Sequence, residues 1–205
     1  MAKKPEEGLI WEWRAFGRTG EGLLSRIVSH PVRMGIVGHS GVDLYLVSPA
    51  SEHNIKLRKW DRGWLLKFKL LLDKSPDLIE LYSESARQVY RFPIDPKRLT
   101  KAASLLNTTL RKKPSAPELT RKQFLKALES ASPAISTVEV AKVRSQFECE
   151  EGWIELAEVD FPKRKVSSVS VHASSLEAVQ RIVEQIDPGP KLKVMNYLEA
   201  CKRWR

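Results

Sequence analysis

The sequence predicts an α+β fold, a closed or nearly closed antiparallel β-barrel that forms a tunnel, with helices packed on its outside. Two observations predict it. Most segments expected to be strands alternate charged and apolar residues, so each strand has one face of each kind. The helical segments are amphipathic and need an apolar surface to cover. If they cover the outer faces of the strands, the charged faces line the inside of the barrel.

The first block of the chain, which ends near Pro93, alternates with a period of two residues. A short helix is expected to interrupt it at residues 21–29, where the apolar residues have helical spacing. The expected strands of this block cover residues 9–16, 42–47, 54–60, 64–72, 78–84 and 87–92.

The period changes between about residues 96 and 132, where two amphipathic helices are expected. The first carries Leu99, Ala102 and Leu106 on one face, and the second follows Thr120, a suitable N-cap. We expect these two helices to form an insert that packs outside the barrel.

Alternation returns after the insert, and the further strands expected there cover residues 138–148, 153–161 and 166–172. C-terminal helices are expected between about residues 174 and 203, one capped by Ser174 and one beginning at Lys191. The late strands would leave an unpaired sheet edge unless they return to the first sheet, and closing a barrel removes both edges. We therefore expect residues 1–205 to form a single domain; a linker at residues 112–117 that separates two domains is the alternative.

Composition narrows the class of protein. The 205 residues carry a formal net charge of +10, which favours a polyanionic partner. No apolar run approaches the roughly 20 residues that span a bilayer, and the first residues lack the apolar segment of an export signal. The two cysteines are too few for a disulfide framework or a four-ligand zinc site. These features predict a cytoplasmic protein with no membrane partner.

Long basic side chains recur at alternate positions of several expected strands, on the charged face. If they converge on one cavity, they focus positive potential there and suit phosphate oxygens. A charged face that is merely solvated is the alternative. The candidate phosphate-binding residues are Arg14, Lys56, Arg58, Lys67, Lys69, Lys142 and Arg144. Tyr82, Ser170 and His172 are expected as further residues of the tunnel.

Several short motifs are spread over most of the chain. They are Trp11-Glu12-Trp13-Arg14, Asp43-Leu44-Tyr45, Asn54-Ile55-Lys56-Leu57-Arg58, Trp64-Leu65-Leu66-Lys67-Phe68-Lys69, Lys142-Val143-Arg144 and the run from Val169 to Glu177. Together they resemble the CYTH or triphosphate tunnel metalloenzyme family. The resemblance implies a closed tunnel of eight antiparallel strands, lined by alternating Glu and Lys or Arg side chains. The family includes triphosphatases and class IV adenylyl cyclases.

The chain departs from that family's pattern at the metal-binding carboxylates. The family's opening motif is Glu-x-Glu-x-Lys, and this chain has Ile10, Glu12 and Arg14 at those positions. The family's last strand offers a Glu-x-Glu pair, and this chain has Ser170 and His172 there. The resemblance therefore implies that phosphate binding is retained while metal-assisted hydrolysis is weakened.

Glu12 is the remaining metal candidate, with Glu80, Glu84 and Glu148 as candidate partners. Mg²⁺ prefers an octahedral shell of oxygen ligands, which these residues would supply poorly. The predicted function is therefore binding of a nucleotide, triphosphate or short polyphosphate in the basic tunnel, with little or no hydrolysis and no required cofactor. A metal-dependent triphosphatase that uses Mg²⁺ or Mn²⁺ is the first alternative. No catalytic residue is assigned.

Binding of nucleic acid or of an acidic protein is the second alternative, because the helical insert is densely basic. Its basic residues include Lys97, Arg98, Lys101, Arg111, Lys112, Lys113, Arg121 and Lys122. The oligomeric state is left open.

Two further residue pairs have competing interpretations. Ser170 and His172 would point the same way from one strand, but no carboxylate that could orient the histidine is identifiable, which disfavours a nucleophile and base. Trp60 and Trp64 flank an expected turn among basic residues. Packing of that turn is the favoured interpretation, and stacking of a base at the tunnel mouth is the alternative.

Overall fold

The computed structural model of the chain describes residues 8–19, 22–29, 33–34, 37–61, 63–84, 88–112 and 114–205, so Glu21, Arg87 and Lys113 of the predictions above lie outside it. The strands are β1 (Leu9–Gly17), β2 (Arg33–Met34), β3 (His39–Val47), β4 (Asn54–Trp60), β5 (Gly63–Lys74), β6 (Glu80–Ser83), β7 (Val89–Arg91), β8 (Ser136–Cys149), β9 (Gly152–Phe161), β10 (Arg164–Ala173) and β11 (Leu192–Val194). The helices are α1 (Leu23–Ser29), α2 (Pro96–Leu105), α3 (Arg121–Ala131), α4 (Leu176–Ile186) and α5 (Tyr197–Trp204). Among the described residues, no helix is long and apolar enough to cross a membrane.

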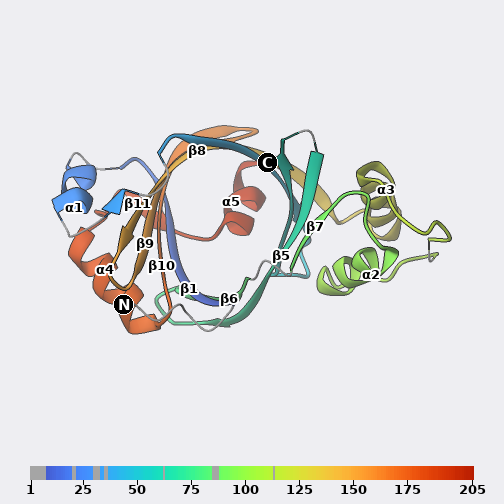
Figure 1. Cartoon of the computed structure of the whole chain (residues 1–205), viewed down its shortest axis with the longest axis horizontal. Coiled ribbons are helices and arrows are strands. Elements are labelled where there is room, and N and C mark those ends of the chain that lie inside the picture. The colour runs from blue at the N-terminus through green and yellow to red at the C-terminus, as the bar shows by residue number, and fades with distance from the viewer. Residues whose placement is uncertain are drawn as a thin grey trace.

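Eight strands form a closed antiparallel barrel (Figure 1). Around the ring they follow the order β1, β6, β5, β4, β3, β8, β9 and β10, and pairing of β10 with β1 closes it. The short strands β2, β7 and β11 pair with β8, β5 and β1. The predicted α+β barrel is confirmed, and the strands that follow the insert return to the first sheet as expected.

The closure of the ring depends on β1, which pairs with different partners along its length. Leu9–Glu12 lie opposite Ser83–Glu80 of β6, whereas Trp11–Gly17 lie opposite Ala173–Ser167 of β10. This stagger accompanies the strand tilt that a barrel requires. Because the ring is closed, none of its strands is left with an unpaired edge.

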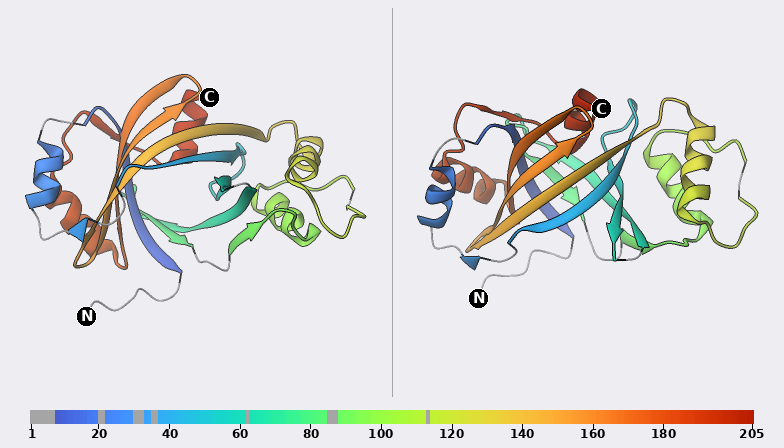
Figure 2. Two further views of the ribbon diagram at one scale, coloured as in Figure 1. Left: turned by 45° about the horizontal axis from the view of Figure 1, so that its top comes forward. Right: turned by 90° about the horizontal axis from the view of Figure 1, so that it is seen from above.

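Four helices cover the apolar outer face of the barrel, as predicted (Figures 1 and 2). On one side, α1 and α4 pack in a core that contains Val169 and Val171 of β10. On the opposite side, α2 and α3 pack in a core with Leu57 of β4 and Leu66 of β5. Because these outer positions are apolar and covered, their charged neighbours on the same strands point into the barrel.

The fifth helix lies inside the ring (Figure 1), a position that the predicted fold, with helices packed on its outside, did not include. The ring of Phe16 on β1 lies 5.1 Å from that of Tyr197 and 5.8 Å from that of Trp204. Trp204 also packs on Phe161 of β9, with ring centroids 5.1 Å apart. Phe16 shares the inner face of β1 with Arg14, so α5 fills one end of the barrel.

The residues on the inner faces of the strands change from apolar to polar along the barrel, and this change explains the position of α5. On β8 the inner residues Val138 and Val140 precede Lys142, and on β1 Arg14 precedes Phe16. Inner positions are therefore apolar at the end of the barrel that holds α5 and polar beyond it. The sequence prediction assigned each strand one charged face along its whole length, and so missed the apolar inner surface that this helix covers.

The C-terminal segments differ from the prediction in two further ways. Residues 192–194 form β11 instead of a first helical turn, because their two apolar residues alternate with the exposed Lys193 and face the core around α4. Helix α5 begins after Asn196, whose side chain caps it. Helix α4 is capped by Ser175, and not by Ser174.

A glycine at the start of β9 gives a test of the barrel's close strand packing. A Cβ atom on Gly152 would overlap the carbonyl oxygen of His172 in β10. We expect Gly152→Ala to lower the free energy of unfolding by about 1–3 kcal/mol in chemical denaturation, because one of the two strands must move. Gly41→Ala is the matched control, since its Cβ would meet no atom within 4 Å. Equal stability of the two variants would contradict the packing described.

Candidate functional site

All the candidate phosphate-binding residues lie on the inner faces of barrel strands. Arg14, Lys56, Lys69 and Lys142 are buried, and Arg58, Lys67 and Arg144 are half-buried. They come from β1, β4, β5 and β8, which alternate inner and outer residues. The structure therefore brings seven basic residues, far apart in the sequence, into one interior; their role in binding phosphate stays a prediction.

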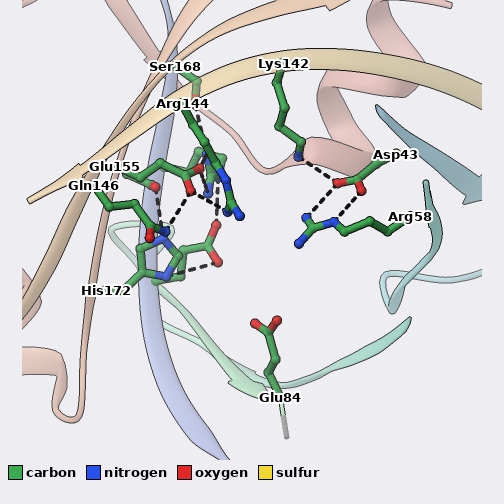
Figure 3. A network of polar contacts seen from close by, with 12 residues as sticks. Asp43, Arg58, Glu84, Lys142, Arg144, Gln146, Glu155, Ser168 and His172 are labelled. Carbon is green, nitrogen blue, oxygen red and sulfur yellow. Dashed lines mark hydrogen bonds and ion pairs between the residues drawn. The ribbon is translucent and has the colours of Figure 1, made fainter. Parts of the chain in front are cut away.

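Three of these cations share one carboxylate, that of Asp43 on β3. Figure 3 shows two of them, Arg58 and Lys142. Asp43 Oδ2 lies 3.1 Å from Lys56 Nζ and 2.8 Å from Lys142 Nζ. Arg58 donates to both carboxylate oxygens, through Nε at 2.8 Å and a terminal nitrogen at 3.0 Å. Asp43, Lys56, Arg58 and Lys142, here called the Asp43 cluster, thus hold more positive than negative charge.

The pKa values in the Asp43 cluster follow from this crowding. Burial would raise the pKa of Asp43, but the charges of Lys56 and Lys142 hold it well below its usual value. Burial lowers the pKa of Lys56 well below its usual value, and the charges of Lys142 and Arg58 lower it further against the attraction of Asp43. An anion bound here would relieve that repulsion and raise the pKa of Lys56 again.

A second group of ion pairs, around Glu12 and Glu155, lies across the interior; Figure 3 labels Glu155 and Arg144 of this group. Arg14 Nε lies 2.7 Å from Glu12 Oε1, and Lys69 pairs with the other oxygen of the same carboxylate. Arg144 lies 3.1 Å from Glu155 Oε2. Burial would raise the pKa of Glu155, but the charges of Arg14 and Lys142 lower it to about 2. Both carboxylates are therefore ionised and paired at neutral pH.

Ser170 and His172 lie beside Glu12, so a carboxylate is present where the sequence revealed none. Ser170 Oγ is 2.9 Å from His172 Nε2, and His172 Nδ1 is 3.6 Å from Glu12 Oε2. The pairing of β1 with β10 places Glu12 directly opposite His172. The longer separation exceeds a hydrogen bond, and Ser170 is fully buried. The arrangement therefore does not offer an accessible nucleophile.

The predicted metal carboxylates do not gather into one site. Glu80 accepts from Tyr82 Oη at 2.6 Å and from Asn196 Nδ2 at 2.7 Å, so it binds the segment that leads into α5. Glu84 pairs with Lys67 at 3.2 Å, and Glu148 lies exposed near the end of β8. In the described part of the chain no group of three acidic, histidine or cysteine side chains could hold a metal ion. These residues do not fit an Mg²⁺ or Mn²⁺ site.

The end of the barrel away from α5 is where β3 begins and β4 ends. A cavity of about 430 Å³ opens there, lined by Asp43, Arg58, Lys142 and Arg144 together with Gly41 and Trp60. An adjoining cavity of about 620 Å³ shares Gly41 and Lys142 with the first, but its other lining residues are not among the candidate phosphate-binding residues. We place the site in the smaller cavity because three of the four residues of the Asp43 cluster, Asp43, Arg58 and Lys142, line it.

Helix α5 contributes one residue to the inner boundary of the site. The Tyr197 ring centroid lies 4.3 Å from Lys142 Nζ and 4.6 Å from the guanidinium carbon of Arg14. Tyr45, whose hydroxyl lies 3.3 Å from Lys142 Nζ, stacks on Tyr197. Among the described residues, the buried Tyr197 hydroxyl and His172 Nδ1 have no hydrogen-bond partner.

The basic insert lies away from this interior, on the outside of the barrel (Figure 1). Three of its cations rest on aromatic rings of the barrel strands. Arg98 lies 4.1 Å from the Tyr90 ring, Arg121 lies 4.4 Å from the Trp64 ring, and Lys101 lies 4.9 Å from the ring of Phe68. These cations attach α2 and α3 to the barrel.

Sequence reasoning missed Asp43 and Glu155 as site residues. Asp43 was noticed within a short motif, but not as the shared partner of three cations. Glu155 lies on the inner face of β9, whereas Glu158 and Asp160 lie on the outer face. The sequence contains a signal for both. Each is the one carboxylate among the inner positions of its strand, two residues before an uncharged inner residue, Tyr45 on β3 or Ala157 on β9.

Comparison with known proteins identifies the fold. No family model matches the sequence, and no curated protein matches it. Among solved structures, HpAC1 from Hippeastrum, a candidate adenylyl cyclase described as having a dominant triphosphatase activity, superposes with a TM-score of 0.55 at 14% identity, over 95% of each chain. PH1012 from Pyrococcus horikoshii superposes with a TM-score of 0.52 at 16% identity, over 92% of this chain and 98% of that one.

A third similar structure is that of a candidate adenylate cyclase from Bacillus halodurans, with a TM-score of 0.50 at 12% identity, over 94% of this chain and 98% of that one. At these identities the likeness establishes the fold. The chain therefore has the CYTH or triphosphate tunnel fold, as the resemblance implied.

The buried histidine gives the site a measurable pH dependence. Burial lowers the pKa of His172 to about 4, against the opposing charge of Glu12. In the unfolded chain the histidine has an ordinary pKa of about 6.5. Between about pH 4 and pH 6.5 His172 is therefore protonated in the unfolded chain and neutral in the folded one. We expect stability to fall by up to about 3 kcal/mol as pH drops from about 6.5 to about 4.

The free energy of unfolding of His172→Gln, measured by chemical denaturation over the same range of pH, should not show the part of the decrease that His172 causes. The exposed His39 gives the control, since His39→Gln should keep it. If His172→Gln and the unmodified protein lost stability in parallel, His172 would not be held neutral by burial.

Proposed function

We propose that the barrel binds the phosphate chain of a nucleotide, a triphosphate or a short polyphosphate, with little or no hydrolysis and without a required metal. The observation that carries the proposal is the sharing of Asp43 by Lys56, Arg58 and Lys142 in a buried place. Burying excess charge is costly, and a phosphate anion would compensate it.

Hydrogen-bond donors remain available for phosphate oxygens. Each lysine ammonium has three N–H donors, and Lys56 and Lys142 each contact only Asp43 and Tyr45 through hydrogen bonds or ion pairs among the described residues. Arg144 bonds Glu155 through one nitrogen and is half-buried at the open end. The buried Tyr197 hydroxyl, which has no partner within the described residues, supplies a further donor.

The proposal of little or no hydrolysis is supported by the state of the carboxylates. Glu12 and Glu155 are paired with arginine or lysine, and Glu80 is bound to the segment before α5. A triphosphatase that activates water on a metal needs carboxylate oxygens free for that metal. Release of phosphate from tripolyphosphate with added Mg²⁺ or Mn²⁺, abolished by Glu12→Gln, would favour the triphosphatase instead.

Calorimetry with tripolyphosphate at low salt tests the binding itself. We expect Arg144→Gln to weaken binding about tenfold or more, since a charged hydrogen bond contributes about 1.5–3 kcal/mol. Lys165→Gln is the matched loss of charge, because Lys165 is 83% exposed and pairs only with Asp160 among the described residues. It should leave the affinity unchanged. Absence of binding by the unmodified protein would refute the proposal.

Binding should also take up protons, because an anion raises the lowered pKa of Lys56. As pH rises, the free protein loses the Lys56 proton before the bound protein does, so the uptake grows with pH. Calorimetry in two buffers of different ionisation enthalpy measures the number of protons. In Lys56→Met the proton uptake should no longer grow with pH. Protons gained or lost by the ligand itself are the same for the variant and the unmodified protein, so they cancel in the difference. Equal uptake in both would exclude Lys56 as the source.

A further inference from the structure

The geometry of the open end points to an aromatic subsite at Trp60, which selects ligands whose triphosphate carries a planar aromatic group, such as a purine nucleoside. This inference rests on the proposed function, because it places the phosphate chain on the Asp43 cluster. It adds a group that recognises the part of the ligand beyond the phosphates.

Strand alternation puts Trp60 in line with the phosphate-binding cations. Lys56, Arg58 and Trp60 occupy every second position of β4 and therefore share its inner face. Lys56 is buried, Arg58 is half-buried and Trp60 is 49% exposed. The row thus runs from charged and buried to aromatic and exposed as it leaves the barrel.

The cavity of about 430 Å³ is lined both by a cation of this row, Arg58, and by its aromatic residue, Trp60. Arg58 and Trp60 line it from β4, and Asp43 and Gly41 line it from β3. A Cβ atom on Gly41 would meet nothing within 4 Å, so this wall leaves open space between Trp60 and the cations. At about 430 Å³ the cavity is within the size range of small-molecule sites.

The other tryptophans near the open end already have partners on their rings. The ring of Trp64 carries the guanidinium of Arg121 at 4.4 Å on the outer side of the barrel. The ring of Trp153 stacks on His172, with centroids 4.7 Å apart. Trp60 has no stacked ring or cation among the described residues. An exposed aromatic ring in a polar, cationic cavity is suited to stacking on a base.

This geometry revises the favoured interpretation of the two tryptophans that flank the hairpin turn. Trp64 points outward and attaches the helical insert, as structural packing requires. Trp60 points to the cavity instead. One residue of the pair is therefore structural, and the other is proposed to determine specificity.

The test compares ATP with tripolyphosphate, which has the phosphates but no ring. We expect Trp60→Ala to lower the affinity for ATP about tenfold or more, in line with the contribution of base stacking, and to leave tripolyphosphate binding unchanged. Trp60→Phe keeps an aromatic face and should retain most of the ATP affinity. ATP should also quench the protein's tryptophan fluorescence, and this quenching should decrease in Trp60→Phe.

A second variant acts on β3, the strand next to that of Trp60, without removing a contact. Gly41→Val places a side chain into the open space and should lower ATP affinity at least tenfold, with an unchanged unfolding temperature. Valine suits a strand, and no atom of the described residues lies within 4 Å of the position of its Cβ.

The outcomes separate this inference from the function on which it rests. If tripolyphosphate binds and neither Trp60→Ala nor Gly41→Val affects ATP, the aromatic subsite is refuted and phosphate binding stands. If ATP binds more tightly than tripolyphosphate but Trp60→Ala has no effect, the base is held elsewhere and the assignment of Trp60 is wrong. If neither ligand binds, the proposed function fails and the subsite fails with it.

Discussion

Burying a charge away from water costs several kcal/mol unless a partner compensates it, and this cost governs the interior of the barrel. Strand pairing brings basic side chains into a space that the closed ring and α5 separate from solvent on all but one side. The carboxylates of Asp43, Glu12 and Glu155 make that tolerable, because each pairs with at least two cations. The ion pairs therefore hold the inner side chains in place and, under the proposed function, set the charge that a bound anion would meet.

The alternation of apolar and charged residues along the strands accounts both for the helices that cover the outside and for the charges that line the inside. On β4 and β5, Leu57 and Leu66 face the insert while Lys56 and Lys67 face the interior. Removing the apolar cover would expose the outer rows and loosen the strands that hold the ion pairs. Residues of the insert thus support the site without touching it.

Period-two alternation was enough to predict the barrel strands and the inner basic residues, and helical spacing predicted the outer helices. Contacts between distant strands were not predictable, because no local pattern encodes them. The approach of His172 to Glu12 follows from the register of β1 on β10. The convergence of three cations on Asp43 likewise needs β3 to lie between β4 and β8. The position of the internal helix was not predicted, because β8 was expected to have a charged inner face along its whole length. Val138 and Val140 instead make that face apolar at one end of the barrel.

Because α5 fills one end of the barrel, the Asp43 cluster is reached from the other end. Under the proposed function, a chain-like phosphate ligand would therefore enter by one of its free ends. A long polyphosphate would then present two binding ends per molecule whatever its length. The number of molecules bound should therefore follow the number of chain ends and not the number of phosphate units, and the ligand would leave by the end through which it entered.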